Sequence, residues 1–537
     1  MAAATFKATP LEDIPQIRDT LRAFFKTGRT LDIAYRKNQL LQLAYLFKEN
    51  EQRWNEAFAA DLCRPQIEVG VLEINGTIGE CIDAWKNVDK WAKPEGVPFD
   101  LTFGVMKPTI FKQPKGVGLV IGPFNYPVLC SIGPLVGAIA AGCPCVVKMS
   151  ELTPTISGLI TELWPKYMDT QFTQIVNGGI PETTALLDLQ WDHIVFTGSG
   201  TVGKIVALAA AKHLTPTTLE LGGQSPVFMD TNMDLTVATR RLLWAKTINA
   251  GQSCTAPNHI FVPAGQEAKL VEAFQKTYKE FYPDGAEKSD SLSRIVADTH
   301  FNRLKGLLDK TEGEIVCGGE TDAKTRFIAP TIVKNVKVDD PLMKAEIFGP
   351  ILPIIPIKDY QEALDHVNAG DHPLALYIYS DDPELKNRII NSTTSGAVDV
   401  NECLIHMGVP GLPFGGVGPS GSGAHTGKFS FDTFTHQRSS IHNPRWTDML
   451  FGWRYPPAAK MKQSAELAPK IPAPRPGPGI AKVTSGGWFS WVSPKSISVL
   501  VVLVTILTVQ RSSFNDALGS LHARLAAGPG ARFITRR

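Results

Sequence analysis

The sequence predicts an α/β protein that is built around a parallel sheet. Between residues 117 and 222, short apolar stretches alternate with longer segments that carry helical periodicity. Because helices between consecutive strands act as crossovers, this alternation favours parallel strands. A further α/β section extends from residue 223 to about residue 407. The strands predicted in the first section are residues 117–122, 145–148, 174–176 and 193–197.

The first 95 residues are predicted to be helical. Apolar side chains recur at the spacing of one helix face, namely Ile14, Ile17, Leu21, Phe24 and Phe25. A second run of this kind covers residues 36–58, and no internal repeat is evident.

Length and composition narrow the class of protein. The 537 residues are enough for two or three domains with large cores. Lys plus Arg is 54 against 52 acidic residues, so the net charge of +2 gives no case for nucleic-acid binding. Eight scattered cysteines suit a reducing compartment, and Cys143 and Cys145 lack the further ligands of a metal site. The N-terminus has no apolar segment, so a signal peptide is not expected.

The composition changes near the C-terminus. Residues 456–486 are rich in proline and predict an extended linker, and residues 510–537 form a basic tail. Between them, residues 488–509 are apolar with Lys495 as the single charge. A helix needs about 20 such residues to span a bilayer, so this segment predicts membrane association, either spanning or lying in the bilayer. The alternative is a β-branched core strand or helix, but the linker separates the segment from the folded part.

Cys254 is the candidate nucleophile. It lies among small and polar residues in the stretch 251–257 (GQSCTAP), which gives a thiol room and nearby backbone N–H groups. The alternative is a buried structural cysteine. Two upstream elements favour catalysis: Glu220 leads into a glycine pair, and Asn125 lies between two prolines.

These three elements, in this order and spacing, resemble the aldehyde dehydrogenase superfamily. The combination is specific, whereas each motif alone is weak, and the resemblance covers roughly residues 10–440. Further segments that agree are 147–151 (VKMSE), 196–199 (FTGS), 346–350 (EIFGP), 412–418 (LPFGGVG) and 429–438 (FSFDTFTHQR).

The resemblance implies a catalytic role for each of the three residues and no metal. Cys254 would attack the aldehyde carbon, and the thiohemiacetal would become a thioester when hydride leaves to a nicotinamide. The Asn125 amide and the Cys254 backbone N–H would bind the oxyanion. Glu220 would be the general base for hydrolysis of the thioester. A turn residue is the alternative for Asn125, and a strand-end surface carboxylate is the alternative for Glu220.

The resemblance also implies a cofactor site. Lys148 and Glu151 would bind the adenosine ribose, and because Glu151 repels a 2′-phosphate, NAD is favoured with NADP possible. Glu346 would hold the nicotinamide ribose with Phe348 packed beside it, although core packing is the alternative for Phe348. The remaining cofactor residues would be Thr197, Gly198, Ser199 and Gly203.

The glycine loop that contains these last residues has two other interpretations. Residues 198–203 match G-x-G-x-x-G after a predicted strand, and the ribose-binding acid would then fall on Glu220. A ribose-binding role for Glu220 conflicts with its role as general base. The resemblance favours Glu151 as the residue that binds the ribose. The loop also nearly matches a triphosphate-binding loop through Lys204, but Ile205 replaces the magnesium-binding hydroxyl.

The segment 412–438 resembles the class 3 branch, in particular the fatty aldehyde dehydrogenases. This implies a homodimer and a fold with three parts. A Rossmann-like NAD-binding domain would comprise residues 1–95 and 117–222, and an α/β catalytic domain residues 223–407. A small β oligomerisation bridge would comprise residues 96–116 and 408–440.

The expected function is oxidation of long, apolar aldehydes. The enzyme would be anchored to a membrane by residues 488–509, and its catalytic domain would lie in the cytosol. The endoplasmic reticulum, lipid droplets and the mitochondrial outer membrane are not distinguished. Apocarotenal dehydrogenases of fungi share this plan, and an aromatic aldehyde is a further alternative. A catalytically silent homologue is another rival, and the joint presence of Cys254, Asn125 and Glu220 argues against it. A CoA-acylating enzyme is the last rival, and Glu220 as a base favours hydrolysis instead.

Overall fold

The computed structural model describes residues 6–100 and 103–457. The chain divides into two compact units, residues 1–444 and 445–537. The described part of the second unit contains the short helices η8 (Arg445–Thr447), α16 (Asp448–Phe451) and η9 (Gly452–Arg454).

A six-stranded sheet forms the centre of the N-terminal body, in the order β17-β7-β6-β3-β4-β5. Its strands are parallel except β17, which pairs antiparallel with β7. The four predicted strands are confirmed, and β7 is an addition that ends at Glu220. The strands are β3 (Gly118–Ile121), β4 (Cys145–Lys148), β5 (Thr173–Val176), β6 (His193–Thr197), β7 (Thr217–Glu220) and β17 (Gly421–Ser422).

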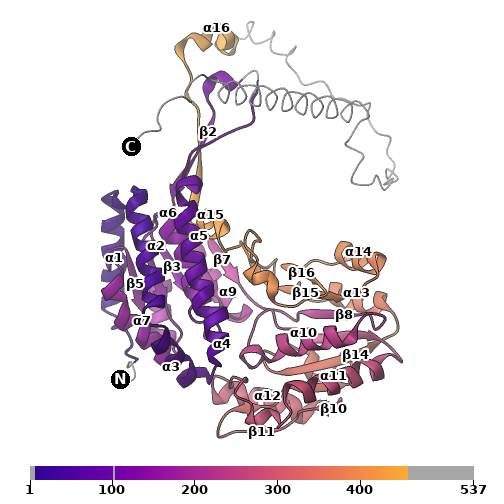
Figure 1. Cartoon of the computed structure of the whole chain (residues 1–537). Helices are drawn as coiled ribbons and strands as arrows, with labels where there is room; N and C mark the ends of the chain where they lie inside the picture. Colours follow the sequence, from indigo (N-terminus) through magenta and orange to yellow (C-terminus); the bar gives the residue numbers. More distant parts are fainter. Residues whose placement is uncertain (1–5, 101–102, 458–537) are drawn as a thin grey trace, which may run out of the picture. The chain divides into compact units, whose positions relative to one another are not determined.

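Helices flank this sheet, and the first helices of the chain stand together at the left of Figure 1. The predicted single run 36–58 is two helices, because the chain leaves α2 at Glu49 and restarts after Asn50. Apolar residues of α2, α3, α5, α6 and α7 share one large core. The helices are α1 (Asp13–Lys26), η1 (Arg29–Leu31), α2 (Ile33–Lys48), α3 (Glu51–Leu62), α4 (Gln66–Val69), the π-helix η2 (Gly70–Ile74), α5 (Asn75–Trp91), α6 (Leu129–Ala141), α7 (Pro154–Tyr167), α8 (Ile180–Leu187) and α9 (Gly200–Ala211).

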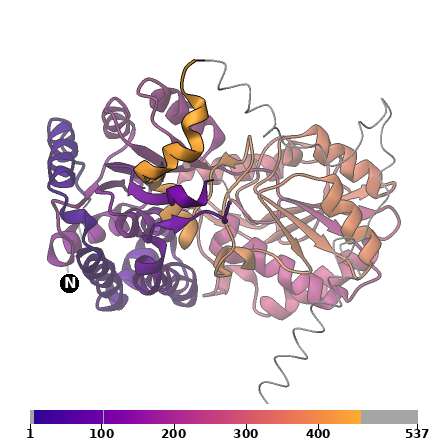
Figure 2. The ribbon, with the colours of Figure 1, turned by 90° about the horizontal axis from the view of Figure 1, so that it is seen from above.

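A second body lies beside the first, as the separate purple and pink-to-orange regions of Figure 2 show. Its seven-stranded sheet has the order β10-β13-β14-β9-β8-β15-β16, parallel except for β10. The strands are β8 (Pro226–Met229), β9 (His259–Pro263), β10 (Glu314–Cys317), β13 (Thr331–Lys334), β14 (Ile351–Ile357), β15 (Ala375–Tyr379) and β16 (Ala397–Val400). Its helices are α10 (Leu235–Thr247), η4 (Ile248–Gly251), α11 (Glu267–Phe281), η5 (Ala286–Lys288), α12 (Asp298–Lys310), η6 (Pro341–Met343), α13 (Tyr360–Ala369), α14 (Pro383–Ser392) and η7 (Ile405–Gly408). A two-stranded ribbon, β11 (Thr321–Asp322) and β12 (Phe327–Ile328), completes it.

A three-stranded sheet is formed by β1 (Glu95–Gly96), β2 (Thr109–Pro114) and β18 (Thr435–Ser440). The short helix η3 (Gly104–Met106) precedes β2. The segment that leads to β18 returns to the first body, since β17 pairs with β7 and α15 (Lys428–Thr433) packs on α6. Residues 408–440 are therefore shared between the small sheet and the six-stranded sheet.

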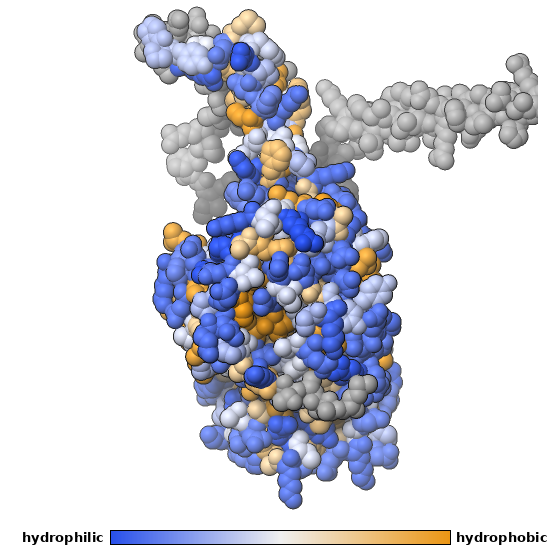
Figure 3. All heavy atoms as spheres, turned by 90° about the vertical axis from the view of Figure 1, so that its left-hand side faces the viewer, coloured by the Kyte–Doolittle hydropathy of each residue, from blue (hydrophilic) through white to orange (hydrophobic). Residues whose placement is uncertain are grey.

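The outer face of the N-terminal helices is largely hydrophilic, with apolar side chains in separate patches (Figure 3). Within the described ranges 6–100 and 103–457, no helix has the length and apolarity needed to cross a bilayer. The predicted membrane segment 488–509 and the basic tail 510–537 lie outside the described residues, as does all of the linker after residue 457.

Candidate functional site

The turn that presents Cys254 is built from left-handed backbone. Helix α10 ends at Thr247, and Asn249, Ala250 and Gly251 then have φ values of 48°, 52° and 70°. Left-handed conformations cost non-glycine residues about 1–2 kcal/mol each, so tertiary contacts must hold this turn.

Two glycines bring the predicted motifs together. A β-carbon on Gly251 would lie 2.4 Å from the carbonyl oxygen of Gly349, so the nucleophile turn lies directly against the segment after Phe348. A β-carbon on Gly222 would lie 2.3 Å from the Glu346 carboxylate. The segments of Glu220, Cys254 and Glu346 therefore meet, and the close approach explains why glycine occupies both positions.

Glu220 is buried at the end of β7. Its relative exposure is 1%, and neither carboxylate oxygen has a hydrogen-bond partner among the residues that the structure describes. Burial raises the pKa of Glu220 well above its usual value, because the charged form is poorly solvated there. A buried carboxyl group without a partner is suited to exchange a proton with a reacting molecule.

Cys254 is half-buried beside these carboxylates. Burial raises the pKa of its thiol, and the negative charges of Glu346 and Glu220 raise it further. The thiol is therefore protonated at neutral pH, and a base must take its proton before it can act as a nucleophile.

Asn125 lies on the loop between β3 and α6 with an unengaged side chain. The residue is 4% exposed, and its side-chain amide makes no hydrogen bond within residues 6–100 and 103–457. Its backbone carbonyl, in contrast, accepts from Asn249 Nδ2 at 2.8 Å and from Arg64 Nη1 at 3.2 Å. The loop is thus fixed while the amide stays available as a donor.

The expected ribose-binding residues lie at the carboxyl edge of the six-stranded sheet. Lys148 ends β4, and its Nζ donates to Glu151 at 2.9 Å. Thr197 ends β6, and its buried hydroxyl lacks a partner among the described residues. Both strands pair with β3, so these ends are neighbours at the edge where doubly wound sheets bind ligands.

The glycine loop begins α9 as the sequence suggests. Ser199 is the N-cap, and its hydroxyl accepts from the Val202 N–H at 3.4 Å. A β-carbon on Gly203 would lie 2.6 Å from Leu221, so glycine lets α9 pack closely against the chain after β7. Gly198 precedes this helix start, where backbone N–H groups favour an anion.

Glu346 and Phe348 lie on the other side of the site. Burial raises the pKa of Glu346 to about 8, against the opposing effect of Lys246. Lys246 is 2% exposed, and burial lowers its pKa to about 7. The Phe348 ring makes an edge contact with Phe124, with centroids 5.9 Å apart.

Sequence reasoning did not find Lys246, Arg64 or Cys130, although each lies near a predicted site residue: Lys246 near Glu346, Arg64 near Asn125, and Cys130 near Cys254. The thiol of Cys130 is close enough to Cys254 and Glu220 for their charges to raise its pKa, after the larger effect of burial. Cys130 could have been noticed because it follows Asn125 by five residues at the start of α6.

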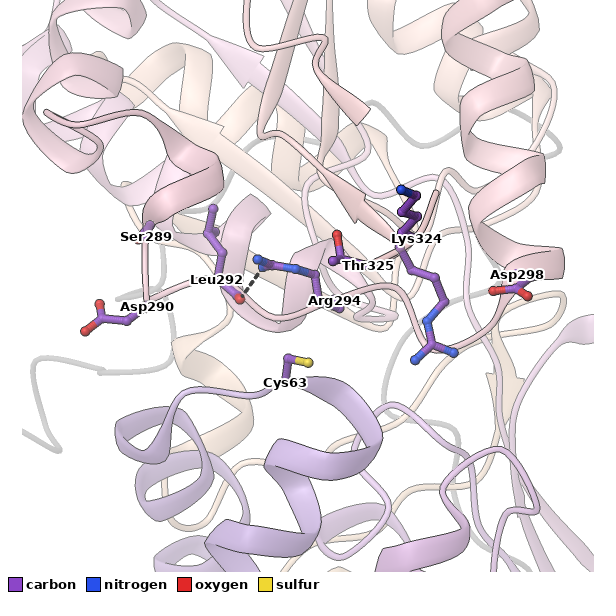
Figure 4. Close-up of a pocket in the computed structure, with 9 residues that line it drawn as sticks. Cys63, Ser289, Asp290, Leu292, Arg294, Asp298, Lys324 and Thr325 are labelled. Carbon is purple, nitrogen blue, oxygen red and sulfur yellow. Dashed lines mark hydrogen bonds between the residues drawn. The ribbon is translucent and has the colours of Figure 1, made fainter. Parts of the chain in front are cut away.

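A separate cavity of about 610 Å³ is lined by none of the predicted site residues (Figure 4). Cys63, at the end of α3, faces the loop that carries Leu292 and Arg294. Three cationic and two acidic side chains line the cavity, so its charge is mixed. Its lining is Cys63, Ser289, Asp290, Leu292, Arg294, Asp298, Lys324, Thr325 and Arg326.

Comparison with known proteins agrees with this geometry. The model of the aldehyde dehydrogenase family matches residues 2–440. "Aldehyde dehydrogenase family 3 member A2" of Rattus norvegicus is 43% identical over 444 residues, which are 83% of this chain and 91% of the relative. "Beta-apo-4'-carotenal oxygenase" of Neurospora crassa is 41% identical over 456 residues, 84% of this chain and 85% of the relative.

Two further matches concern the assembly and the fold. "Aldehyde dehydrogenase, dimeric NADP-preferring" of Rattus norvegicus is 41% identical over 449 residues, 83% of this chain and 99% of the relative. The structure of Staphylococcus aureus AldH in its substrate-bound state has a TM-score of 0.82 and 40% identity, and it covers 84% of this chain and 99% of that chain. These matches confirm the expected aldehyde dehydrogenase fold, its class 3 relatives and its dependence on NAD(P). The chain belongs to the aldehyde dehydrogenase family.

Proposed function

We propose that this enzyme oxidises long, apolar aldehydes to carboxylic acids, with Cys254 as nucleophile, Asn125 in the oxyanion site and Glu220 as general base. The observation that supports this most is the Glu220 carboxyl group, which is buried without a partner among the described residues and close enough to influence the Cys254 thiol. A carboxyl group kept in that state is expensive for the fold and suited to proton transfer.

The first chemical step is addition of the Cys254 sulfur to the aldehyde carbon. The Cys254 thiol releases its proton to solvent, a C–S bond forms, the π bond of the carbonyl breaks, and the carbonyl oxygen becomes an oxyanion. The free amide of Asn125 and the backbone N–H of Cys254 are the proposed donors to that oxygen. In comparable sites one such donor is worth about 3 kcal/mol.

The second half of the reaction releases the acid. Once hydride has left the thiohemiacetal carbon, Cys254 carries a thioester. Glu220 then takes a proton from water as the water oxygen attacks the thioester carbon, and the thiolate leaves. Burial raises the pKa of Glu220, which makes its ionised form a stronger base for this step.

The residues that we propose for the cofactor fit a dinucleotide. Lys148, Glu151 and the unpartnered hydroxyl of Thr197 would hold the adenosine ribose and adjacent phosphates, and the start of α9 provides N–H groups for phosphate. Glu346 would hold the nicotinamide ribose. When bound, NAD or NADP supplies the hydride acceptor.

Apolar side chains near Thr255, the residue after Cys254, support an apolar substrate. The Thr255 hydroxyl donates to Met407 Sδ at 3.3 Å, which places Met407 beside the residue that follows Cys254. Leu72 and Trp244 pack against the same apolar cluster as Met407. An apocarotenal is the second candidate substrate, because of the Neurospora relative.

Assembly and location belong to the same proposal. A homodimer is supported by the rat relative whose name describes it as dimeric. Membrane association through residues 488–509, with the catalytic part in the cytosol, is supported by the apolar composition of that segment. Lipophilic aldehydes partition into bilayers, so attachment there would raise their local concentration.

The test is an assay of the full chain with lipid vesicles, in which NADH formation is followed for saturated aldehydes of increasing length, one apocarotenal and one aromatic aldehyde. The control is Cys254→Ala. The proposal expects Cys254-dependent rates that rise with chain length. Equal rates for short and long aldehydes would contradict the preference for long, apolar substrates. Turnover in Cys254→Ala would contradict the role of Cys254 as nucleophile.

A further inference from the structure

We propose that Arg64 is a positioning residue of the oxyanion site, which holds the Asn125 amide opposite Cys254 although Arg64 contacts no reacting atom. This inference rests on the proposed roles of Asn125 and Cys254.

Arg64 is placed to hold the loop of Asn125. Its side chain is fully buried, and Nη1 donates both to Glu73 Oε1 at 2.7 Å and to the Asn125 carbonyl at 3.2 Å. The guanidinium also lies over the Tyr126 ring, 4.6 Å from its centroid. Burying a guanidinium is costly, so a fold retains one where its contacts define a geometry or support a function.

Glu73 extends this hold to the other end of the loop. It is fully buried, and its Oε2 accepts from the N–H groups of Val128 at 3.2 Å and Leu129 at 2.8 Å, where α6 begins. Burial raises the pKa of Glu73 to about 7, while Arg64 opposes that rise. The Arg64–Glu73 ion pair therefore fixes both ends of the segment from Asn125 to Leu129 by hydrogen bonds.

The same network reaches the turn before Cys254. The Asn125 carbonyl that accepts from Arg64 also accepts from Asn249 Nδ2 at 2.8 Å, and Asn249 is the first left-handed residue of that turn. The Asn249 N–H donates to Glu68 Oε2 at 3.0 Å, and Arg64 Nε lies 3.4 Å from the same oxygen. Arg64 is thus linked to the turn before Cys254 through two shared acceptors, the Asn125 carbonyl and the Glu68 carboxylate.

The consequence is a defined distance between the amide and the thiol. The Asn125 side chain has no hydrogen bond of its own within the described residues, so its position depends on its backbone. A misplacement of about 1 Å can cost about a hundredfold in rate. Lysine cannot donate in two fixed directions, so Arg64→Lys is expected to lower kcat/KM by about tenfold to a hundredfold.

The test uses the full chain as wild type, Arg64→Lys, Asn125→Ala and the double variant. Arg240→Lys is the control, because Arg240 makes an exposed ion pair with Glu280 in the second body. NADH binding and circular dichroism show whether each variant is folded and binds cofactor. Iodoacetamide alkylation of Cys254 reports a thiol reaction that needs no oxyanion site.

If Arg64 acts through Asn125, Arg64→Lys lowers kcat/KM while cofactor affinity and alkylation stay within about twofold of wild type. In the Asn125→Ala background the same change has a much smaller effect, since the group that it positions is gone.

Three results would overturn the inference: full additivity of the two changes, a parallel loss of alkylation, or a wild-type rate in Arg64→Lys. Each presupposes an active wild type. A wild type without aldehyde oxidation would instead remove the proposed function together with this inference.

Discussion

Replacing Glu220 by glutamine should make the enzyme more stable and less active at once. Burial raises the pKa of this carboxyl group, so the folded protein holds its proton more tightly than the unfolded chain does. The stabilising contribution is fully present below the unfolded pKa of about 4.3 and is lost as the pH rises through the folded pKa. Glutamine does not ionise, so Glu220→Gln avoids this loss.

The size of the effect follows from linkage. Each unit by which the folded pKa exceeds the unfolded one costs about 1.4 kcal/mol once the pH is above both values. Both oxygens of Glu220 lack partners among the described residues, and an unpaired buried polar group costs about 1–3 kcal/mol. Because glutamine also leaves two polar atoms unpaired, the gain comes from the charge alone. We expect Glu220→Gln to be more stable than the wild type near pH 9 and to show no such gain near pH 4.

The assay pairs urea unfolding at both pH values with steady-state NADH production. Turnover should fall by about 10²–10⁴, the usual contribution of a positioned base. Asp322→Asn is the control. A hydrogen bond from Thr325 lowers the pKa of this solvent-accessible carboxylate, so ionised Asp322 stabilises the fold at high pH, opposite to Glu220. A Glu220→Gln protein that is destabilised equally at both pH values, or that keeps its turnover, would refute this reasoning.

Three further predictions concern the thiol and the cofactor. Burial and then Glu346 raise the pKa of Cys254, so the rate of Cys254 alkylation by iodoacetamide in the free enzyme should climb with pH without a plateau below about pH 9. Gly222→Ala places a β-carbon 2.3 Å from Glu346 and should weaken NADH binding, measured by fluorescence, by about tenfold, whereas Gly306→Ala meets nothing within 4 Å and should not. Glu151→Ala should lower the preference for NAD over NADP, measured as the ratio of kcat/KM values, and an unchanged ratio would place the ribose elsewhere.

The strands of the first body were predictable because their residues are apolar and buried on both faces. Cys145–Lys148 and His193–Thr197 match the predicted bounds, since each is a short apolar run between polar segments. The strand Thr217–Glu220 was not predicted, because its alternating buried and half-buried residues include two threonines and no apolar run. The break between α2 and α3 at Asn50 was not predicted, because the apolar periodicity continues across it.

The candidate site was partly predictable. Motif order identified Cys254, Glu220 and Asn125, and the structure brings the Cys254 and Glu220 segments together with that of Glu346 through glycine contacts. The network around Arg64 was not predictable, because it joins residues separated by up to 181 positions along the chain. No local pattern in a single sequence marks an arginine whose partners are contributed by distant loops.

The most direct test of the central claim is the mass of the protein after Glu220→Gln has reacted with a saturated aldehyde and NAD. If Cys254 is the nucleophile and Glu220 activates the water, an acyl thioester accumulates on the peptide that contains Cys254. It amounts to about one acyl group per chain, with one NADH formed for each. Absence of the adduct despite NADH formation, or an adduct on Cys130 instead, would contradict the account.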